Sequence, residues 1–377
     1  MRKSLLALVA AGLMASVTLT ACDDGGDPGD NGDSGTATTG SGSSSGKGGI
    51  GVILPDTKSS QRWKDDDPKY LKEAFENAGV PYQIQNAEGD KEQFKRIADQ
   101  MLSDEVKVLV IANLDSVSGK AVIDRAKARK VPVIDYDRMT LNGGADYYVS
   151  FNNNLVGKLQ GQHLQQCLSA KKRVNPIVAE LNGSRTDNNA TLFKEGYDGV
   201  LQPLYESATY TKGPDQFVPE WDNDEAREIF TQMLDQYPNI GGVLAANDGL
   251  GNAAIEVLRE KKLNGDVPVT GQDATVQGLQ NILAGDQCMT VYKSIKKEAD
   301  EASKLAINLF KDVKPSVSEK LKDPQSGAYI PFVSLTPVAI TFKNIKFVVE
   351  DEFVSAQTLC TAKFRKACQR AGLINQG

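Results

Sequence analysis

Short apolar runs and segments with helical periodicity alternate along this chain from residue 50 onward. Residues 50–54 form an almost continuous apolar run, whereas residues 91–102 place Phe94, Ile97 and Met101 on one face of a helix. This alternation predicts an α/β fold with parallel sheets flanked by helices. Further strands are expected at residues 82–85, 106–112, 131–136, 176–181, 208–211, 243–246, 267–271 and 289–292. Further helices are expected at residues 68–77, 116–128 (capped by Ser116), 153–167, 191–204, 223–237, 249–260, 276–284 and 295–310.

Four apolar runs stop abruptly at polar or charged side chains. The runs 131–136, 242–246, 267–271 and 289–292 are followed by Asp137-Arg138, Asn247-Asp248, Gln272-Asp273 and Lys293, respectively. In a sheet whose strands alternate with helices, the carboxyl ends of neighbouring strands open into one crevice, where ligands usually bind. We therefore expect these hydrogen-bonding groups to surround a small polyol.

The N-terminus has the pattern of an export signal. Arg2 and Lys3 precede an apolar stretch at residues 5–19, which is too short to span a bilayer with its own polar flanks. The tetrapeptide Leu-Thr-Ala-Cys that ends at Cys22 follows at once. Its resemblance to bacterial lipoprotein signals implies cleavage after residues 1–21, lipidation of the Cys22 sulfur and tethering to the outer face of a membrane. The alternative is an ordinary cleaved signal with an incidental cysteine.

The next segment, residues 22–49, is composed mainly of Asp, Gly, Ser and Thr. Such a composition buries too little apolar area to fold, so it predicts a disordered linker. Its aspartates recur at every third position, unlike the ligands of a calcium-binding EF-hand loop. The remaining residues 50–377 are long enough for two lobes. The formal net charge of −6 includes five linker aspartates, so no nucleic-acid partner is expected.

Four cysteines follow the linker. An exported location permits disulfides, and the short spacing of Cys360 and Cys368 makes them the first candidate pair. The sequence leaves open whether Cys167 and Cys288 also meet.

Several kinds of chemistry have no motif in this chain. The single histidine, His163, lies inside an expected helix, which excludes a multi-histidine metal site and disfavours histidine catalysis. No phosphate-binding G-x-x-x-x-G-K-[ST] loop is present, and no G-x-S-x-G nucleophile motif lies within residues 50–377. We therefore expect no cofactor and no bound metal, and any nucleotide hydrolysis must come from another chain.

Carboxylates near the expected strand ends allow two roles. Two of them could form the acid/base pair of a glycosidase. They could instead accept hydrogen bonds from sugar hydroxyls while basic side chains donate, and this second role accounts for more of the residues. The candidate acceptors are Asp137, Asp187 and Asp273, and the candidate donors are Arg62, Arg138 and Lys293.

Two tryptophans, Trp63 and Trp221, lie in polar segments expected to be loops. An indole face against the C–H side of a pyranose buries much apolar area at little conformational cost. The alternative is that each indole packs within its own lobe.

Seven segments resemble, in order and spacing, the D-xylose-binding protein family of ABC sugar importers. They are Gln61-Arg62-Trp63, Tyr136-Asp137-Arg138-Met139, Tyr148-Val149-Ser150-Phe151-Asn152-Asn153, Thr186-Asp187-Asn188-Asn189-Ala190, Asn247-Asp248, Gly271-Gln272-Asp273-Ala274 and Met289-Thr290-Val291-Tyr292-Lys293. The likeness runs from about residue 50 to residue 354. A weaker similarity, at residues 55–63 and 221–222, points to multiple-sugar-binding proteins that take glucose, galactose and arabinose.

The resemblance implies a two-lobed type I periplasmic binding protein fold with a three-segment hinge. The N-terminal lobe would comprise residues 50–149 and 289–328, and the C-terminal lobe residues 150–288 and 329–354. It implies a monosaccharide held by Arg62, Asp137 and Arg138 from one lobe, by Asp187, Asn189, Trp221, Asn247 and Asp273 from the other, and by Lys293 near the hinge, with the ring sandwiched between Trp63 and Trp221. Asp248 and Gln272 would support the second lobe.

The same resemblance implies partners and a location. A monomeric extracytoplasmic receptor would deliver D-xylose, or another monosaccharide, to an ABC permease and its ATPase subunit. Three features depart from the family: Asn152-Asn153 replaces Asp-Asn, residues 213–220 fit poorly, and the tail at residues 355–377 has no counterpart. For this tail we expect a disulfide-stapled surface helix.

Other functions compete with the transport receptor. They are a glycoside-cleaving enzyme, a sugar sensor, a sugar-responsive transcription regulator and a receptor for a non-sugar ligand such as an autoinducer. The regulator would need an N-terminal helix-turn-helix, where this chain has a lipobox-like sequence and a linker.

Overall fold

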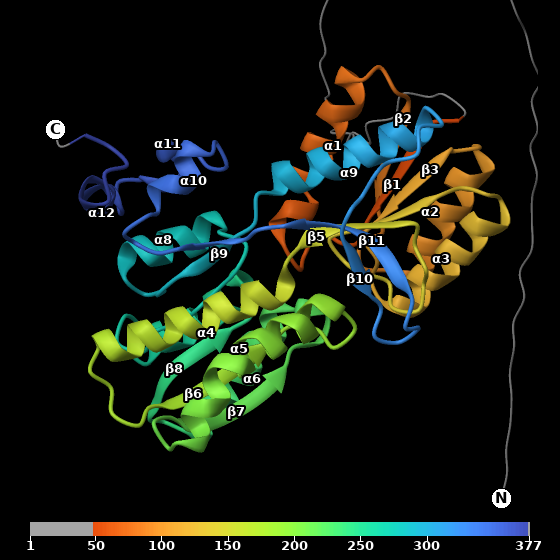
Figure 1. Ribbon diagram of the computed structural model, residues 1–377. Helices are drawn as coiled ribbons and strands as arrows, with labels where there is room; N and C mark the ends of the chain where they lie inside the picture. Colours follow the sequence, from red (N-terminus) through yellow and green to blue (C-terminus); the bar gives the residue numbers. More distant parts are fainter. Residues whose placement is uncertain (1–47, 376–377) are drawn as a thin grey trace, which may run out of the picture. The chain divides into compact units, whose positions relative to one another are not determined.

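The computed structural model describes residues 48–375, which lie within one compact unit at residues 41–377. The expected signal peptide, the lipidation site Cys22 and nearly all of the expected linker lie outside the described residues. Among residues 48–375, no helix has the length and apolar character needed to cross a membrane. Strands and helices alternate along this part of the chain in a mostly parallel α/β fold (Figure 1).

The first lobe is built on a seven-stranded sheet of order β10-β11-β5-β4-β3-β1-β2, in which only β10 runs antiparallel to its neighbour. Its strands are β1 (Ile50–Leu54), β2 (Tyr82–Asn86), β3 (Val108–Ile111), β4 (Val133–Tyr136), β5 (Tyr147–Phe151), β10 (Lys320–Lys322) and β11 (Tyr329–Leu335). Its helices are the short 3₁₀ turn η1 (Gln61–Trp63), α1 (Asp66–Asn77), α2 (Lys91–Ser103), α3 (Ser116–Ala128) and α9 (Ile295–Phe310).

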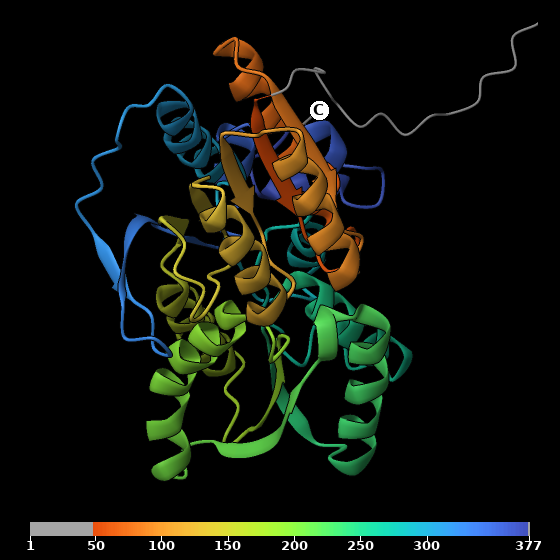
Figure 2. The same cartoon turned by 90° about the vertical axis from the view of Figure 1, so that its right-hand side faces the viewer.

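Helices cover both faces of this sheet because successive strand residues point to opposite sides. Val52 and Leu54 belong to a hydrophobic cluster with residues of α1 and α9. Ile53, between them, belongs to a separate cluster with residues of α2 and α3. Figure 2 shows the latter pair of helices lying against the strands. The strands are therefore buried on both faces, as their continuous apolar sequence predicts.

The second lobe combines a parallel sheet, β7-β6-β8, with an antiparallel pair, β12-β9. Residues 267–271 connect them: Val243 bridges to Val269, and the Val291 N–H donates to the carbonyl of Gly271. Its strands are β6 (Ile177–Asn182), β7 (Thr211–Phe217), β8 (Ile240–Ala245), β9 (Thr290–Tyr292) and β12 (Val338–Ile340). Its helices are α4 (Asn153–Ala170), α5 (Asn188–Glu206), the 3₁₀ turn η2 (Pro219–Trp221), α6 (Asn223–Gln236), α7 (Asp248–Glu260), α8 (Val276–Ala284), α10 (Lys346–Glu350), α11 (Ala356–Leu359) and α12 (Arg365–Arg370).

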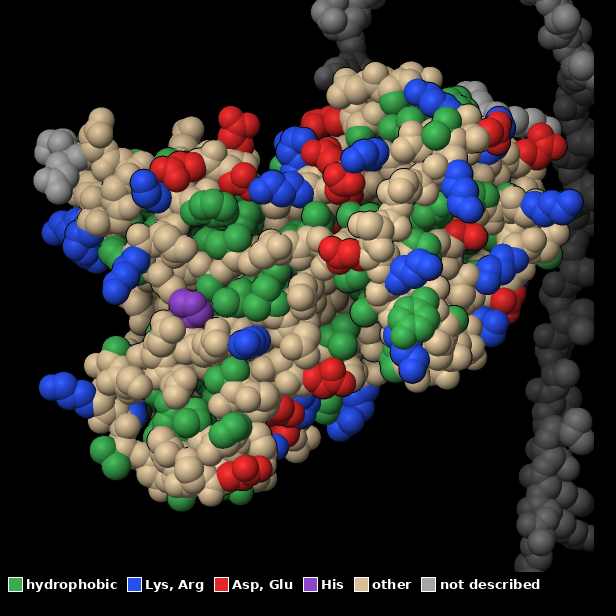
Figure 3. Space-filling view, in the orientation of Figure 1, with side chains coloured by type: hydrophobic (Ala, Val, Ile, Leu, Met, Phe, Trp, Pro, Cys, Tyr) green, Lys and Arg blue, Asp and Glu red, His purple; other side chains and the backbone are tan. Residues whose placement is uncertain are grey.

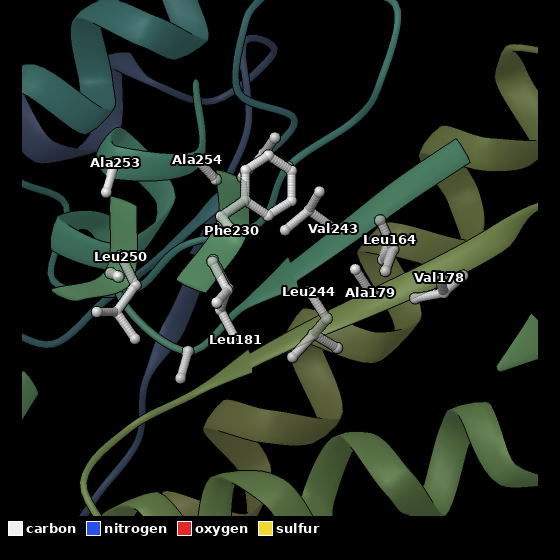
Figure 4. Close-up of a cluster of buried hydrophobic side chains, with 14 of the residues drawn as sticks. Leu164, Val178, Ala179, Leu181, Phe230, Val243, Leu244, Leu250, Ala253 and Ala254 are labelled. Carbon is white, nitrogen blue, oxygen red and sulfur yellow. The ribbon is translucent and has the colours of Figure 1, made fainter. Parts of the chain in front are cut away.

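A continuous hydrophobic cluster holds this lobe together. Leu181, Leu244 and Phe230, shown in Figure 4, are fully buried members of it. On the outside of the molecule, acidic and basic side chains are interspersed over the face shown in Figure 3, which is in keeping with the modest net charge of −6.

The chain passes between the lobes three times: from β5 to α4, from β9 to α9, and from β11 to β12. The expected lobe boundaries differ in two places. Residues 329–335, which we expected in the second lobe, form β11 and pair with β5 in the first sheet. Residues 290–292, which we expected in the first lobe, form β9 and pair with β12. The three crossings follow β5, β9 and β11, and each therefore lies a few residues later in the sequence than expected.

Three local expectations also need correction. The strand expected at residues 208–211 lies instead at β7. Residues 267–271 form only an isolated bridge, because Pro268 lacks an N–H for a regular ladder. The cap of α3 is Asp115, whose side chain accepts a hydrogen bond from the Ser118 N–H, and not Ser116.

Two disulfides stabilise the second lobe. Cys167 at the end of α4 joins Cys288 just before β9, and Cys360 joins Cys368 within the tail. The tail carries two short helices, α11 and α12, whose Leu359 and Cys368 are buried in one cluster with residues of α8. The tail is thus part of the second lobe.

Candidate functional site

A small cavity of about 30 Å³ lies where the two lobes meet, at the carboxyl ends of strands from both sheets. All ten residues expected to bind a ligand line it: Arg62, Trp63, Asp137, Arg138, Asp187, Asn189, Trp221, Asn247, Asp273 and Lys293. Four further residues that we did not expect as ligands complete the wall: Ser59, Ser60, Phe193 and Gln272.

Contacts within the protein hold the Arg62 side chain in place. The turn η1 places its guanidinium among three carboxylates, with two hydrogen bonds of 2.7 and 2.8 Å to Asp67, one of 2.7 Å to Glu298 and one of 2.8 Å to Asp137. A guanidinium has five N–H donors, so these bonds leave one. Arg62 therefore mainly orients Asp137, with a single donor left for a ligand.

Asp137 is held ionised at the centre of the site. Its Oδ2 accepts from Arg62 and, at 3.1 Å, from the Lys293 ammonium. Burial alone would raise the pKa of Asp137, but the charges of Lys293 and Arg62 outweigh it and hold the pKa well below its usual range. Lys293 keeps two of its three N–H donors for other acceptors. The pair therefore offers both an acceptor and donors to hydroxyl groups.

Asp273 occupies the equivalent position in the second lobe. Each aspartate follows an apolar run, and each donates its N–H to a neighbouring strand: Asp137 to the Val149 carbonyl at 2.8 Å, Asp273 to the Val291 carbonyl at 2.9 Å. Burial raises the pKa of Asp273, although Lys293 opposes the shift. The Ser60 hydroxyl reaches its carboxylate at 3.1 Å from the other lobe.

Further polar contacts join the lobes around the cavity. The Arg138 Nε lies 3.3 Å from the Asp187 carboxylate, which also accepts from the Trp221 indole N–H at 3.2 Å. The Asn189 amide donates to the Asp137 carbonyl at 3.0 Å and to its side chain at 3.1 Å. These groups are buried, so water is excluded from them and each contact is strengthened.

The two indoles pack within their own lobes and also reach the cavity. Trp63 and Trp221 are each buried in the hydrophobic cluster of their own lobe, and each also lines the cavity. The Trp63 ring carries the Arg62 guanidinium 4.2 Å from its centroid, while Trp221 meets Phe193 edge-on with centroids 6.3 Å apart. A sugar sandwiched between the indoles remains a proposal.

Three cavity residues have backbone conformations that ordinary residues rarely adopt. The φ angles of Asp137, Trp221 and Asp273 are 61°, 58° and 98°. Such conformations cost roughly 1–3 kcal/mol each and cluster at ligand sites, where the surrounding structure holds them. Here they are associated with the side chains that face the cavity.

Of the two residues expected to support the second lobe, Gln272 lines the cavity and Asp248 does not. Asp248 does not line the cavity: its carboxylate accepts hydrogen bonds from Thr275, Thr290 and Gln287, and burial raises its pKa to about 7. Gln272, which we also expected as support, lines the cavity and donates to Asp273. Its position directly after an apolar run was the signal that could have identified it.

Phe193, Ser59 and Ser60 were harder to identify from the sequence as cavity residues. Phe193 lies on the apolar face of α5, where a helical pattern predicts only core packing. Ser59 and Ser60 lie in the loop before η1, whose path the sequence does not indicate. Within residues 48–375, no group of three or more His, Cys, Asp or Glu side chains is arranged to hold a metal ion.

Comparison with known proteins points to one family. Residues 50–313 match the family described as periplasmic binding protein domain. The chain is 33% identical over 312 residues to a D-xylose-binding periplasmic protein of Haemophilus influenzae, covering 82% of this chain and 91% of the relative. It is 32% identical over 320 residues to the multiple sugar-binding periplasmic protein SbpA of Azospirillum brasilense, covering 80% and 88%.

The fold agrees with these relatives. A solved ABC transporter solute-binding protein from Clostridium phytofermentans with bound β-D-glucose matches with a TM-score of 0.75 and 25% identity, covering 82% of this chain and 99% of that one. Together with the cavity between two α/β lobes, these similarities confirm the family and the fold that the sequence motifs predict. The chain belongs to the D-xylose-binding family of type I periplasmic sugar-binding proteins.

Proposed function

We propose that this protein is the extracytoplasmic receptor of an ABC sugar importer and that it captures D-xylose between its lobes. The observation that carries the proposal is the convergence of ten separately identified polar and aromatic residues on one cavity. They come from segments as distant as Arg62 and Lys293, and both lobes contribute. The name of the Haemophilus influenzae relative supports xylose as the ligand.

Capture works through closure of the lobes. One lobe offers Asp137 and Arg138, the other offers Asn247 and Asp273, and Lys293 lies at the crossing between β9 and α9, so a sugar contacts both sets only when the lobes are together. Each hydrogen bond between a charged group and a hydroxyl contributes about 1.5–3 kcal/mol once water is excluded. Several such bonds and stacking on the indoles are sufficient for micromolar binding despite ordering costs.

The same geometry favours binding over catalysis. A glycosidase needs one carboxyl group that holds a proton as general acid and a second that acts as base or nucleophile. Asp137 is ionised by Lys293 and Arg62, and Asp187 is engaged with Arg138 and the Trp221 indole. Their positions suit carboxylates that accept hydrogen bonds from hydroxyls, so we propose that the protein is not an enzyme.

The delivery partners are part of the proposal. An ABC permease and its ATPase subunit would take the sugar, since the chain has no phosphate-binding loop of its own. We propose that lipidated Cys22 tethers a monomeric receptor to the membrane, on the basis of the lipobox-like sequence alone.

A multiple-sugar receptor is the second candidate. It is favoured by the similarity to the multiple sugar-binding protein of Azospirillum brasilense and by the solved relative with bound glucose. Calorimetric titration of the signal-less protein with xylose, glucose, galactose, arabinose and ribose separates the two. The proposal expects xylose to bind at least tenfold more tightly than glucose. Equal affinities would favour the second candidate, and no heat with any of these sugars would contradict both.

A further inference from the structure

A larger cavity adjoins the candidate site. Its volume is about 410 Å³, and four residues line both cavities: Ser59, Arg138, Asp187 and Trp221. We term it the outer pocket. The rest of its wall includes Lys58, Glu88, Leu114 and Glu220. Cavities that bind small ligands commonly measure about 300–1,000 Å³, so the outer pocket has the size of a ligand site.

The outer pocket is lined by the kinds of groups that bind sugars. Leu114 and Trp221 provide apolar surface, and both lobes provide polar side chains. Within the described part of the chain, no hydrogen bond or ion pair engages the Lys58 ammonium. Glu88 uses one carboxylate oxygen to accept from the Thr57 hydroxyl at 2.6 Å and keeps the other. Donors and acceptors therefore remain for hydroxyl groups.

The boundary between the two cavities is held in a strained conformation. Glu220 and Trp221 are consecutive and have φ angles of 50° and 58°. This places Glu220 on the outer pocket and Trp221 on both cavities. Gly183 lies against the indole, where an added Cβ would overlap the ring. The indole thus lines both adjoining spaces, and a ligand that spans them would contact it in each.

We infer that the outer pocket is a second saccharide subsite, so that the protein binds disaccharides with one ring in the candidate site and the other in the outer pocket. The inference rests on the proposed function and extends its ligand class. Carboxylates outnumber cations around the outer pocket, with Lys58 and Arg138 the only basic side chains that line it in the described structure. The second ring is therefore neutral and not a uronic acid.

The test compares a monosaccharide with its disaccharide by calorimetric titration. The pair is xylose with xylobiose if the sugar panel selects xylose, or glucose with cellobiose if it selects glucose. The parent is compared with the double variant Lys58→Ala/Glu88→Gln, whose side chains line only the outer pocket. The matched control is Lys311→Ala/Glu319→Gln, two exposed positions remote from either cavity's lining.

The parent should bind the disaccharide at least as tightly as the monosaccharide. The double variant should weaken the disaccharide about tenfold and the monosaccharide less than twofold, and the control should change neither. A parent that binds the monosaccharide but not the disaccharide overturns the inference alone. Equal effects of the double variant on both ligands, or none on either, overturn it as well. A parent that binds no sugar overturns the proposed function and the inference with it.

Discussion

Trp221 can line the cavity of the candidate site only because Gly183, which lies against its indole ring, has no side chain. An added Cβ at Gly183 would overlap three atoms of the indole ring, and the indole N–H is tied to Asp187. The indole therefore has one position, set by a small residue that does not itself line the cavity. This makes Gly183 a means of testing the role of Trp221 without removing it.

We expect Gly183→Ala to weaken binding of D-xylose at least about tenfold, because the indole must move away from the place where it meets the ligand. Titration calorimetry measures the affinity, and tryptophan fluorescence reports the displaced ring. Gly199→Ala in α5 is the control, since nothing lies within 4 Å of the added Cβ. Unchanged affinity in Gly183→Ala together with altered fluorescence would show that Trp221 is not a ligand.

Sequence pattern located those cavity residues that come at the ends of apolar runs. Asp137, Asn247 and Lys293 directly follow such runs, and parallel strands carry their carboxyl ends to one edge. Phe193 was missed because a buried face of a helix looks the same whether it packs on a core or on a cavity. The limited donor capacity of Arg62 was also unforeseen, since it depends on Asp67 and Glu298 meeting it in space.

At the scale of elements, the second lobe depends on two helices that touch through glycine. An added Cβ at Gly157 of α4 would overlap the Phe193 carbonyl in α5, and one at Gly196 of α5 would overlap the Asn154 carbonyl in α4. Because Phe193 also lines the cavity, the close approach of the helices positions part of the site. Packing and ligand geometry are therefore linked.

Gly157→Ala should lower the free energy of unfolding by about 1–3 kcal/mol, because the helices must separate to admit the methyl group. Gly199→Ala makes the same change on an open face of α5 and should be neutral or stabilising by up to about 1 kcal/mol. Chemical denaturation followed by circular dichroism measures both. Equal stabilities of the two variants would contradict this account of the contact.

Regular elements were predictable where the pattern was strong and local. The bounds expected for α3, α8 and α9 agree with the structure. The strand β7 was misplaced because it contains Gly213 and Pro214, which weaken a strand pattern, and it survives as an edge strand whose register against β6 shifts at these two residues. Local pattern also cannot say which sheet a strand joins, and β11 returns to the first lobe by pairing with β5.

At the scale of the whole molecule, buried carboxyl groups should make stability depend on pH. Burial raises the pKa of Asp135 and of Asp248 to about 7 and also raises that of Glu298. A raised pKa in the folded state means that folding favours the protonated form. Its contribution to stability is complete below the unfolded pKa of about 4 and is lost as pH rises through the folded pKa.

The melting temperature should therefore fall by several degrees between about pH 5 and pH 8. Asp248→Asn removes one of the three groups and should flatten this decline, even though it also loses hydrogen bonds. Asp312→Asn, at an exposed position, should leave the slope unchanged. Thermal unfolding measured across this range provides the comparison, and a melting temperature that rises from pH 5 to pH 8 would contradict the assignment.

The arrangement of the two lobes follows from three crossings, which the family resemblance predicted in number and which the structure places a few residues later along the chain. The disulfide pair of the tail was predicted, whereas the expected surface helix is instead the two short helices α11 and α12, whose burial against α8 depends on a surface that forms only in the folded lobe. The cavity is the product of all three crossings, since Asp137 and Asp273 oppose each other only in the folded molecule.

The central claim is that this cavity captures a sugar through groups from both lobes. Titration calorimetry of D-xylose against the parent and against Asp273→Asn tests it most directly, because Asn tolerates the positive φ at this position and keeps the size of the side chain. The account predicts micromolar or tighter binding to the parent and an affinity about ten- to a hundredfold lower for the variant, with an unchanged melting temperature. Equal affinity of the two proteins for D-xylose would contradict it.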